Sequence, residues 1–333
     1  MSRRTWASFA TLILILLLAG CTPSPLLKSY FLGGGSEAYT SVFSRNQKAF
    51  EIKKVPFFPQ DKYQCGPAAL ATVASFYHIQ KMPEEIRTAV FLPGRKGSFQ
   101  VELSAELRAM GLIPYQLPAN FENILAEVES GSPVLVLQNL GNSLLPVWHY
   151  AVVVGFDLDK KRIVLNSGKH ERLDVPIARF YHTWKQAGYW AVVAQPAGSI
   201  PVSAELNAYL FNVADMEELG YLRWAEKAYS SAAKKWPDSK LPLIGLSNVL
   251  YQFGDYVNAE KFLLQALKLS PNDGDILNNL AYTYAQQHCY KQALSALEKA
   301  LGLQPENKGY LSSKREIYSW QEDRKNEYCK GAQ

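Results

Sequence analysis

The sequence predicts an α+β domain followed by an all-α domain. In the first domain, helical patterns come early and strand patterns follow, an order typical of helices packed on an antiparallel sheet. From Val202 onward the strand patterns stop, and small residues recur at a fixed step of 34 residues, which is typical of stacked helical repeats. The chain of 333 residues is long enough for two such domains, and its composition is that of an ordinary globular protein.

Residues 1–20 carry the pattern of an export signal. Arg3 and Arg4 precede an apolar run over residues 11–18, which is too short to span a bilayer comfortably. The run ends in Leu18-Ala19-Gly20-Cys21, which resembles the lipobox of bacterial lipoproteins. This resemblance implies that residues 1–20 are a signal peptide, and that Cys21 is lipidated and becomes the N-terminus of the mature chain.

The segment after Cys21 bears on location. Thr22 stands where an inner-membrane retention signal usually has Asp, so the resemblance favours a lipid-anchored protein of the outer membrane that faces the periplasm. Residues 21–52 contain Ser, Gly and Pro and are expected to be a flexible tether. The formal net charge is +5, but no run of Lys or Arg suggests a nucleic-acid partner. The expected membrane contact is the lipid anchor alone.

The cysteine count points to one free thiol. If Cys21 is lipidated, Cys65, Cys289 and Cys329 remain, and two of three thiols are expected to pair in an oxidising compartment. Cys289 and Cys329 both lie in the C-terminal region, so we expect a disulfide between them. Cys65 is then the free thiol.

The α+β domain is expected over residues 53–198. We expect helices over residues 65–78, 100–110 and 121–130, and strands over residues 133–137, 149–156, 162–165 and 189–194. A short strand and a polar loop are expected over residues 55–64. The segment Val134-Leu135-Val136-Leu137 is apolar on both faces, so we place this strand at the centre of the sheet.

Cys65 stands where the polar loop meets the first apolar helix. Gly66 and Pro67 follow it and open the helical run. At the first turn of a helix the helix dipole favours a thiolate, so we expect Cys65 to titrate below the usual thiol value of about 8.5.

A predicted hairpin supplies two further polar groups. The strand that opens with His149 is followed by a turn over residues 157–160 and a return strand that ends at Asn166. Folding this hairpin places Asn166 close to His149. A Cys, a His and an Asn that converge form an arrangement that activates a thiol nucleophile.

These residues resemble the bacteriocin-processing, double-glycine leader peptidases and their stand-alone relatives, which are papain-like cysteine peptidases. The resemblance covers residues 55–196 and is carried by the motifs Gln60-x4-Cys65-Gly66-Pro67-Ala68-Ala69-Leu70, His149-Tyr150-Ala151-Val152-Val153-Val154-Gly155-Phe156 and Ile163-Val164-Leu165-Asn166. It implies a papain-like peptidase fold. The combination with a lipobox and helical repeats is similar to a group of bacterial lipoproteins described as cysteine peptidases.

The resemblance also implies a role for each motif residue. Cys65 would be the nucleophile, His149 the general base and Asn166 the residue that orients the imidazole. The family more often has Asp at the last position, whereas papain has Asn. Gln60 would donate to the oxyanion together with the Cys65 backbone N–H. Because the glutamine of the relatives usually stands one residue further from the cysteine, Gln64 remains a competitor.

The all-α domain is expected over residues 203–333. Four sets of residues recur at a spacing of 34. They are the set Ala225, Ala259 and Ala293; the set Ala232, Ala266 and Ala300; the set Pro237, Pro271 and Pro305; and the set Leu222, Tyr256 and Tyr290. The pattern resembles three tetratricopeptide repeats over residues 208–307, with a capping helix over 309–328. The first repeat departs from the pattern, since Asn212 stands where a core apolar residue is expected.

Two functions from different classes remain open. The leading hypothesis is a cysteine peptidase that hydrolyses peptide bonds of a peptide or protein substrate, with the repeats binding a protein partner or the substrate. Transfer to an amine instead of water stays open, because the same residues catalyse both. The alternative is a non-catalytic interaction lipoprotein whose peptidase-like domain is a degenerate binding module. No metal-ligand spacing and no phosphate-binding glycine loop occurs, so we expect no metal and no cofactor.

Overall fold

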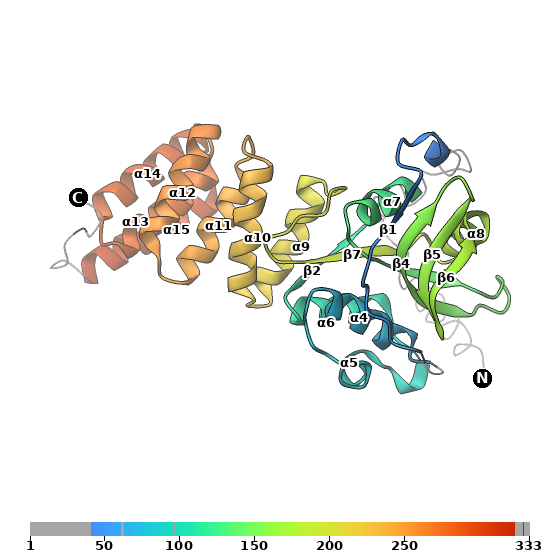
Figure 1. Cartoon of the computed structure of the whole chain (residues 1–333). Coiled ribbons are helices and arrows are strands. Elements are labelled where there is room, and N and C mark those ends of the chain that lie inside the picture. Colours follow the sequence, from blue (N-terminus) through green and yellow to red (C-terminus); the bar gives the residue numbers. More distant parts are fainter. Residues whose placement is uncertain (1–40, 61–62, 96, 324–328, 330–333) are drawn as a thin grey trace, which may run out of the picture.

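The computed structural model describes residues 41–60, 63–95, 97–323 and 329. The signal peptide, Cys21 and most of the expected tether lie outside the described residues. Within the described residues the chain forms an N-terminal domain built on a sheet and a C-terminal array of helices, which lie side by side in Figure 1.

The N-terminal domain is built on a seven-stranded sheet in which every pairing is antiparallel. Its strands are β1 (Ala49–Glu51), β2 (Leu112–Gln116), β3 (Val134–Asn139), β4 (Trp148–Asp157), β5 (Arg162–Ser167), β6 (His170–Pro176) and β7 (Ala191–Pro196). The order is β2-β7-β3-β4-β5-β6, and β1 pairs with β4. Strand β3 is buried along its whole length between β7 and β4, which confirms the central position expected from its apolar sequence.

Five helices belong to this domain: α4 (Cys65–Phe76), α5 (Pro83–Val90), α6 (Gln100–Ala109), α7 (Phe121–Glu129) and α8 (Ile177–Gln186). Helices α4, α6 and α7 agree with the expected ones. The expected short strand over residues 55–64 is wrong, because no strand forms there in the described residues. Pro56 and Pro59 lack the N–H that a sheet ladder needs, which explains why this segment pairs with no strand.

The folded domain begins earlier than expected. Residues 41–51, assigned to the tether, form a short 3-10 helix (Ser41–Ser44) and strand β1. Val42 is fully buried, and Arg45 forms salt bridges with Glu122 and Glu129 of α7. These contacts make residues 41–51 part of the sheet domain.

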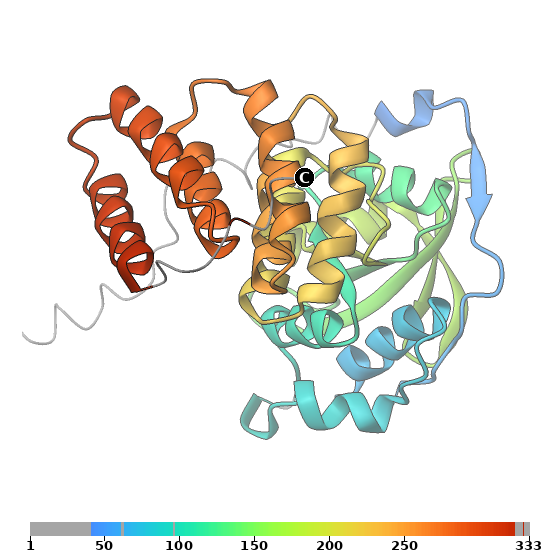
Figure 2. The same cartoon turned by 90° about the vertical axis from the view of Figure 1, so that its left-hand side faces the viewer.

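Up to residue 323, the described part of the C-terminal domain consists of seven consecutive helices: α9 (Leu206–Glu218), α10 (Leu222–Lys235), α11 (Leu241–Gln252), α12 (Tyr256–Leu269), α13 (Gly274–Gln286), α14 (Tyr290–Leu303) and α15 (Lys308–Asp323). They stack in chain order away from the sheet domain (Figures 1 and 2). Pro237, Pro271 and Pro305 each follow two residues after the end of α10, α12 and α14, as the spacing predicted. Three helix pairs and a final capping helix result.

The first repeat packs directly on the sheet domain. Arg108 at the end of α6 forms a salt bridge of 2.6 Å with Asp215 of α9 and donates to Asn212 Oδ1 at 3.3 Å. Gly111 lies so close to the Trp224 ring that an added Cβ would approach it to 2.6 Å. Asn212 departs from the repeat pattern because its neighbour is a charged group of the other domain.

At the far end of the array, Cys289 and Cys329 form a disulfide with a Cα–Cα distance of 4.4 Å, which confirms the expected pairing. Cys65 is the free cysteine among the described residues. Among all the described residues, no helix is long and apolar enough to cross a membrane.

Candidate active site

Cys65 is the first residue of α4. Gln64 precedes it as the N-cap residue and makes no capping bond with its side chain, and the backbone N–H groups of Cys65 and Gly66 face the Cys65 thiol instead. Gly66 must be glycine here, because a Cβ would meet Ser98 Oγ at 2.9 Å. The thiol is partly buried under the neighbouring strand β4.

The sequence led us to expect a pKa of the Cys65 thiol below its usual value, but the surroundings of the thiol favour a higher one. Burial raises the pKa of the Cys65 thiol, and hydrogen bonds from the backbone of Tyr150, Gly66 and Cys65 itself lower it without cancelling the rise. In the free protein, burial therefore favours the protonated thiol over the thiolate.

His149 lies near the start of β4, next in sequence to the residue whose backbone contacts the thiol. Its Nε2 is 2.8 Å from Ser167 Oγ. Burial lowers the pKa of the imidazole, so the neutral ring is favoured near neutral pH. No hydrogen bond joins Cys65 Sγ to His149 among the described residues. Such contacts are often long in free enzymes and shorten once substrate is bound.

Asn166 takes a different position from the one expected. The register of the β4–β5 hairpin pairs it with Val152, so it shares a sheet face with Val152 and Tyr150 and not with His149. Its Oδ1 accepts from Arg172 N at 3.0 Å, and its Nδ2 donates to Pro56 O at 3.3 Å. Asn166 fixes the end of β5 instead of contacting the imidazole.

Ser167, which no sequence motif singles out, is the residue that contacts His149. In the alternating pattern of an antiparallel pair, the residue after Asn166 points to the face that His149 occupies. Counted from the turn over residues 158–161, a regular register would pair Asn166 with Val153 and place it on the face of His149. A register shift between Val153 and Gly155 moves the pairing by one residue, which turns Asn166 away and brings Ser167 to that face.

Gln60 is buried and lies beside the same strand end. Its Oε1 accepts from Gly168 N at 3.1 Å, and its backbone N donates to Gly168 O at 2.9 Å. This double contact fixes the amide next to Ser167 and directs Nε2 away from Gly168. Gln64 has a different place, as the N-cap residue of α4. The geometry therefore connects Gln60, and not Gln64, to the strand end that carries Ser167.

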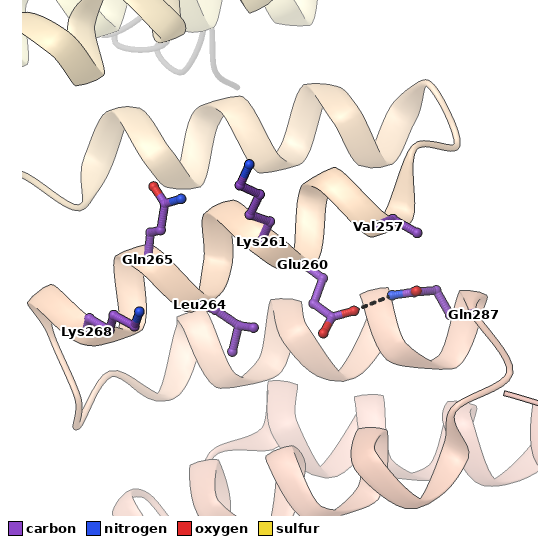
Figure 3. A pocket seen from close by; sticks show the side chains of 7 residues that line it. All are labelled: Val257, Glu260, Lys261, Leu264, Gln265, Lys268 and Gln287. Carbon is purple, nitrogen blue, oxygen red and sulfur yellow. Dashed lines mark hydrogen bonds between the residues drawn. The ribbon is translucent and has the colours of Figure 1, made fainter. Parts of the chain in front are cut away.

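No group of three or more metal-ligating side chains occurs among the described residues. A separate hollow of about 320 Å³ lies on the repeat domain (Figure 3). It is lined by Val257, Glu260, Lys261, Leu264, Gln265, Lys268 and Gln287, with Gln287 donating to Glu260 at 2.8 Å. These side chains include no thiol and no imidazole.

Two family models match this chain. The Peptidase_C39 like family matches residues 52–192, and a tetratricopeptide repeat model matches residues 250–317. The chain thus contains a Peptidase_C39-like domain followed by tetratricopeptide repeats. Among curated proteins, none matches the chain.

Solved structures resemble one domain at a time. A C39-like peptidase from Bacillus anthracis is 16% identical with a TM-score of 0.37, over 45% of this chain and 98% of that one. The first TPR domain of human RPAP3 is 15% identical with a TM-score of 0.34, over 35% of this chain and 93% of that one. The second TPR domain of human RPAP3, solved in complex with an HSP70 peptide, is 17% identical with a TM-score of 0.32, over 33% of this chain and 91% of that one. None of them is close enough to indicate a shared activity.

Proposed function

We propose that this chain is a cysteine peptidase that hydrolyses peptide bonds with Cys65 as nucleophile and His149 as general base, because its residues 52–192 form a Peptidase_C39-like domain. The observation that supports it most directly is the position of the Cys65 thiol next to the strand that carries His149. The free thiol at the start of α4 contacts the backbone of Tyr150, and Tyr150 follows the one histidine of β4.

The first half of the reaction starts from a neutral pair. In the tautomer with its proton on Nε2, His149 would donate to Ser167 Oγ, and the lone pair of Nδ1 would be the one that accepts the thiol proton. As Sγ bonds to the scissile carbonyl carbon, its proton moves to Nδ1. The same proton then passes to the leaving amine as the C–N bond breaks, which leaves an acyl-thioester.

The second half returns the site to its starting state. His149 accepts a proton from water, the hydroxide bonds to the acyl carbon, and Sγ leaves and takes the proton back as a thiol. In both halves the oxyanion would accept from the Cys65 backbone N–H and from Gln60 Nε2, whose amide is fixed by Gly168. Ser167 holds the ring angle, and Asn166 holds the strand end that carries Ser167.

The repeats would bind a protein partner or a second part of the substrate. Tetratricopeptide repeats generally mediate contacts between proteins, and the hollow on α12 combines exposed Val257 with two lysines (Figure 3). The first repeat packs against the β2 side of the sheet, whereas Cys65 and His149 lie at β4, so the repeats would act at a distance from the bond that is cut. As the sequence predicts, we place the protein in the periplasm, anchored through Cys21.

The rival function is a binding module without turnover. It is favoured by one observation, the raised pKa of the Cys65 thiol together with the absence of a hydrogen bond to His149 among the described residues. In that case the repeats carry the function and the sheet domain binds a peptide without cutting it.

A fluorescent peptidyl acyloxymethyl ketone separates the two functions, because such probes alkylate a thiol efficiently only when catalytic groups assist. We expect an adduct on Cys65, identified by mass spectrometry, that is absent in Cys65→Ala and formed at least about tenfold more slowly in His149→Ala, a loss of roughly 1.4 kcal/mol of transition-state stabilisation. His182→Ala, on α8, is the matched control and should label like the parent. Labelling that is equally slow in the parent and in His149→Ala would leave only the binding module.

A further inference from the structure

The loop between β3 and β4 exposes a run of apolar side chains. Leu144 is 89% exposed and Leu145 is 74% exposed, and Val147 and Trp148 are each 55% exposed. These residues, with the intervening Pro146, form an uninterrupted sequence of five that ends beside His149. Scattered exposed apolar residues are ordinary, but a contiguous set marks a surface that is covered by something.

The loop is held in one shape by two asparagines. Asn139 Oδ1 accepts from Gly141 N at 3.0 Å and from Val147 N at 2.9 Å. Asn142 Oδ1 accepts from Leu144 N at 2.9 Å and from Leu145 N at 2.8 Å. The exposed leucines are therefore positioned by hydrogen bonds, and their exposure is a property of the folded loop.

A glycine is required at the narrowest point of this loop. A Cβ on Gly141 would lie 2.1 Å from the carbonyl oxygen of Leu145. Leu140 N also donates to Val147 O at 2.8 Å across the base of the loop. The base is thus a closed hairpin that projects Leu144 and Leu145 beyond it.

The surface is convex. The exposed fraction falls from 89% at Leu144 to 49% at Leu140, so the apolar side chains are most exposed at the tip and less so at the base. A side chain that lines a peptide groove is partly covered by the opposite wall, and Leu144 has no such wall. A projecting apolar tip fits a fluid hydrocarbon layer, which closes around any shape, with an indole at the level of the headgroups.

The charges around the loop agree with this environment. No Asp, Glu, Lys or Arg occurs from Gln138 to Trp148. Outside the loop, the exposed Lys169 follows two residues after Ser167, whose hydroxyl contacts His149, and the exposed Glu171 follows two residues later. The loop itself therefore carries no charge that would oppose its entry into a hydrocarbon layer.

The chain outside the structure also allows this contact. The described chain begins at Ser41, and the expected lipid attachment at Cys21 is 20 residues earlier. An extended chain of that length spans at most about 70 Å, so an anchored domain can lie against the bilayer in any orientation. One lipid anchor does not fix that orientation, whereas a second contact does.

We propose that the loop over residues 140–148 inserts the Leu144-Leu145 tip into the surface of a lipid bilayer, with Trp148 at the headgroup level. This adds a protein contact to the membrane, where the sequence led us to expect the lipid anchor alone. Since Trp148 precedes His149, the inserted loop holds the candidate active site next to the bilayer. Peptide segments that emerge from the membrane or lie on it would then be the ones within reach.

The test measures the depth of the loop in the full chain and does not depend on catalysis. A single cysteine is placed by Leu144→Cys in the Cys65→Ala background, labelled with the environment-sensitive dye NBD, and the protein is reconstituted into vesicles of phosphatidylethanolamine and phosphatidylglycerol. We expect a blue shift of NBD emission and quenching by lipids that carry a doxyl group on the acyl chain. Val257→Cys is the control, at an apolar position of α12 that is 64% exposed, and should show neither effect.

Three results would overturn the proposal. An NBD emission that stays at its aqueous position shows that the tip does not enter the bilayer. A blue shift that grows with protein density but resists doxyl quenching shows that a second copy of the chain covers the tip. A shift that appears only after a peptide is added shows that the loop is part of the substrate site.

Discussion

The two domains differ in how far apart in the sequence their contacting residues lie. In the repeat domain each helix packs on its neighbours in the chain, as α13 does on α14 and α11 on α12. In the sheet domain the candidate site joins Gln60 and Cys65 to His149 and Ser167, which come from separate elements brought together by the sheet. The repeats are thus a local structure, and the site is a product of the sheet register.

This difference determines how far from the substituted residue the effect of a substitution extends. Stability in a repeat array is approximately a sum of the repeats and of their interfaces with neighbours, so a substitution there acts nearby. A substitution that alters one strand of the sheet moves every side chain on it relative to Cys65. The docking of α9 and α10 on the sheet domain is a place where the two behaviours meet.

The largest local effect is expected from removing the disulfide at the far end of the array. The bond between Cys289 and Cys329 closes a loop of 40 residues, which corresponds to about 4 kcal/mol on the chain-entropy estimate. Cys329→Ser should lower the unfolding free energy of α13 to α15 by that order and leave the sheet domain unchanged. Amide hydrogen exchange resolved by peptide measures both. Equal loss of protection in both domains would show that the repeats are not a local structure.

Gly111→Ala should lower the free energy of unfolding by about 2–5 kcal/mol, part of it at the contact between the domains. The residue has φ of +78°, which costs a non-glycine residue about 1–2 kcal/mol, and its new Cβ would meet the Trp224 ring, an overpacking worth about 1–3 kcal/mol. Gly131→Ala is the matched control, with φ of +90° and no atom within 4 Å of the added Cβ. Urea unfolding should show the larger loss of unfolding free energy for Gly111→Ala. Equal losses in the two variants would mean that the contact with the Trp224 ring does not contribute to stability.

The same contrast explains what the sequence could predict. The repeats, their ends at Pro237, Pro271 and Pro305 and the disulfide followed from spacing, because each depends on residues close in sequence or on counting. Asn212 looked like a defect until the neighbouring Arg108 explained it.

The site was predicted only in part, for a physical reason. Cys65 and His149 follow from local patterns, a helix start and a strand start. The partner of His149 depends on the register between β4 and β5, which a residue pattern fixes only to within one position, and that position decides between Asn166 and Ser167. The pKa of Cys65 depends on burial by distant elements, which the helix start alone does not contain.

Ser167→Ala should slow turnover by roughly tenfold while leaving the affinity for substrate unchanged, since the serine orients the imidazole and touches no substrate in the proposed mechanism. A tenfold loss corresponds to about 1.4 kcal/mol. Ser167→Thr keeps the hydroxyl and should restore most of the rate, which a purely structural role would not allow.

Asn166→Ala is the neighbouring control. It should lower stability, through the lost bonds to Pro56 and Arg172, more than it lowers the rate at a temperature where it is folded. The kcat and KM of the two alanine variants, beside their Tm values, decide between them.

The smallest expected effect is a pH-dependent one at the junction of the domains. Glu127 of α7 is fully buried, and its Oε1 accepts from Ser203 N at 2.8 Å and from Ser203 Oγ at 2.5 Å, which ties the linker to the sheet domain. Burial raises the pKa of this carboxyl, while the bonds from Ser203 and the charge of Lys235 lower it without cancelling the rise. The folded protein therefore holds this proton more tightly than the unfolded chain does.

The sign of the pH effect follows from that difference. A group whose pKa is raised on folding contributes stability that is fully present below its unfolded pKa, about 4.3 for Glu, and lost as pH rises through the folded pKa. Glu127→Gln removes this loss, so the Tm of the variant minus that of the parent should become more positive from about pH 4 to pH 8. Ser203→Ala should steepen the loss in the parent and change no pH dependence in the Glu127→Gln background. A Tm difference that does not change with pH would mean that the bonds from Ser203 and the charge of Lys235 offset the burial of the Glu127 carboxylate in full. The charge would then not destabilise the junction of the two domains.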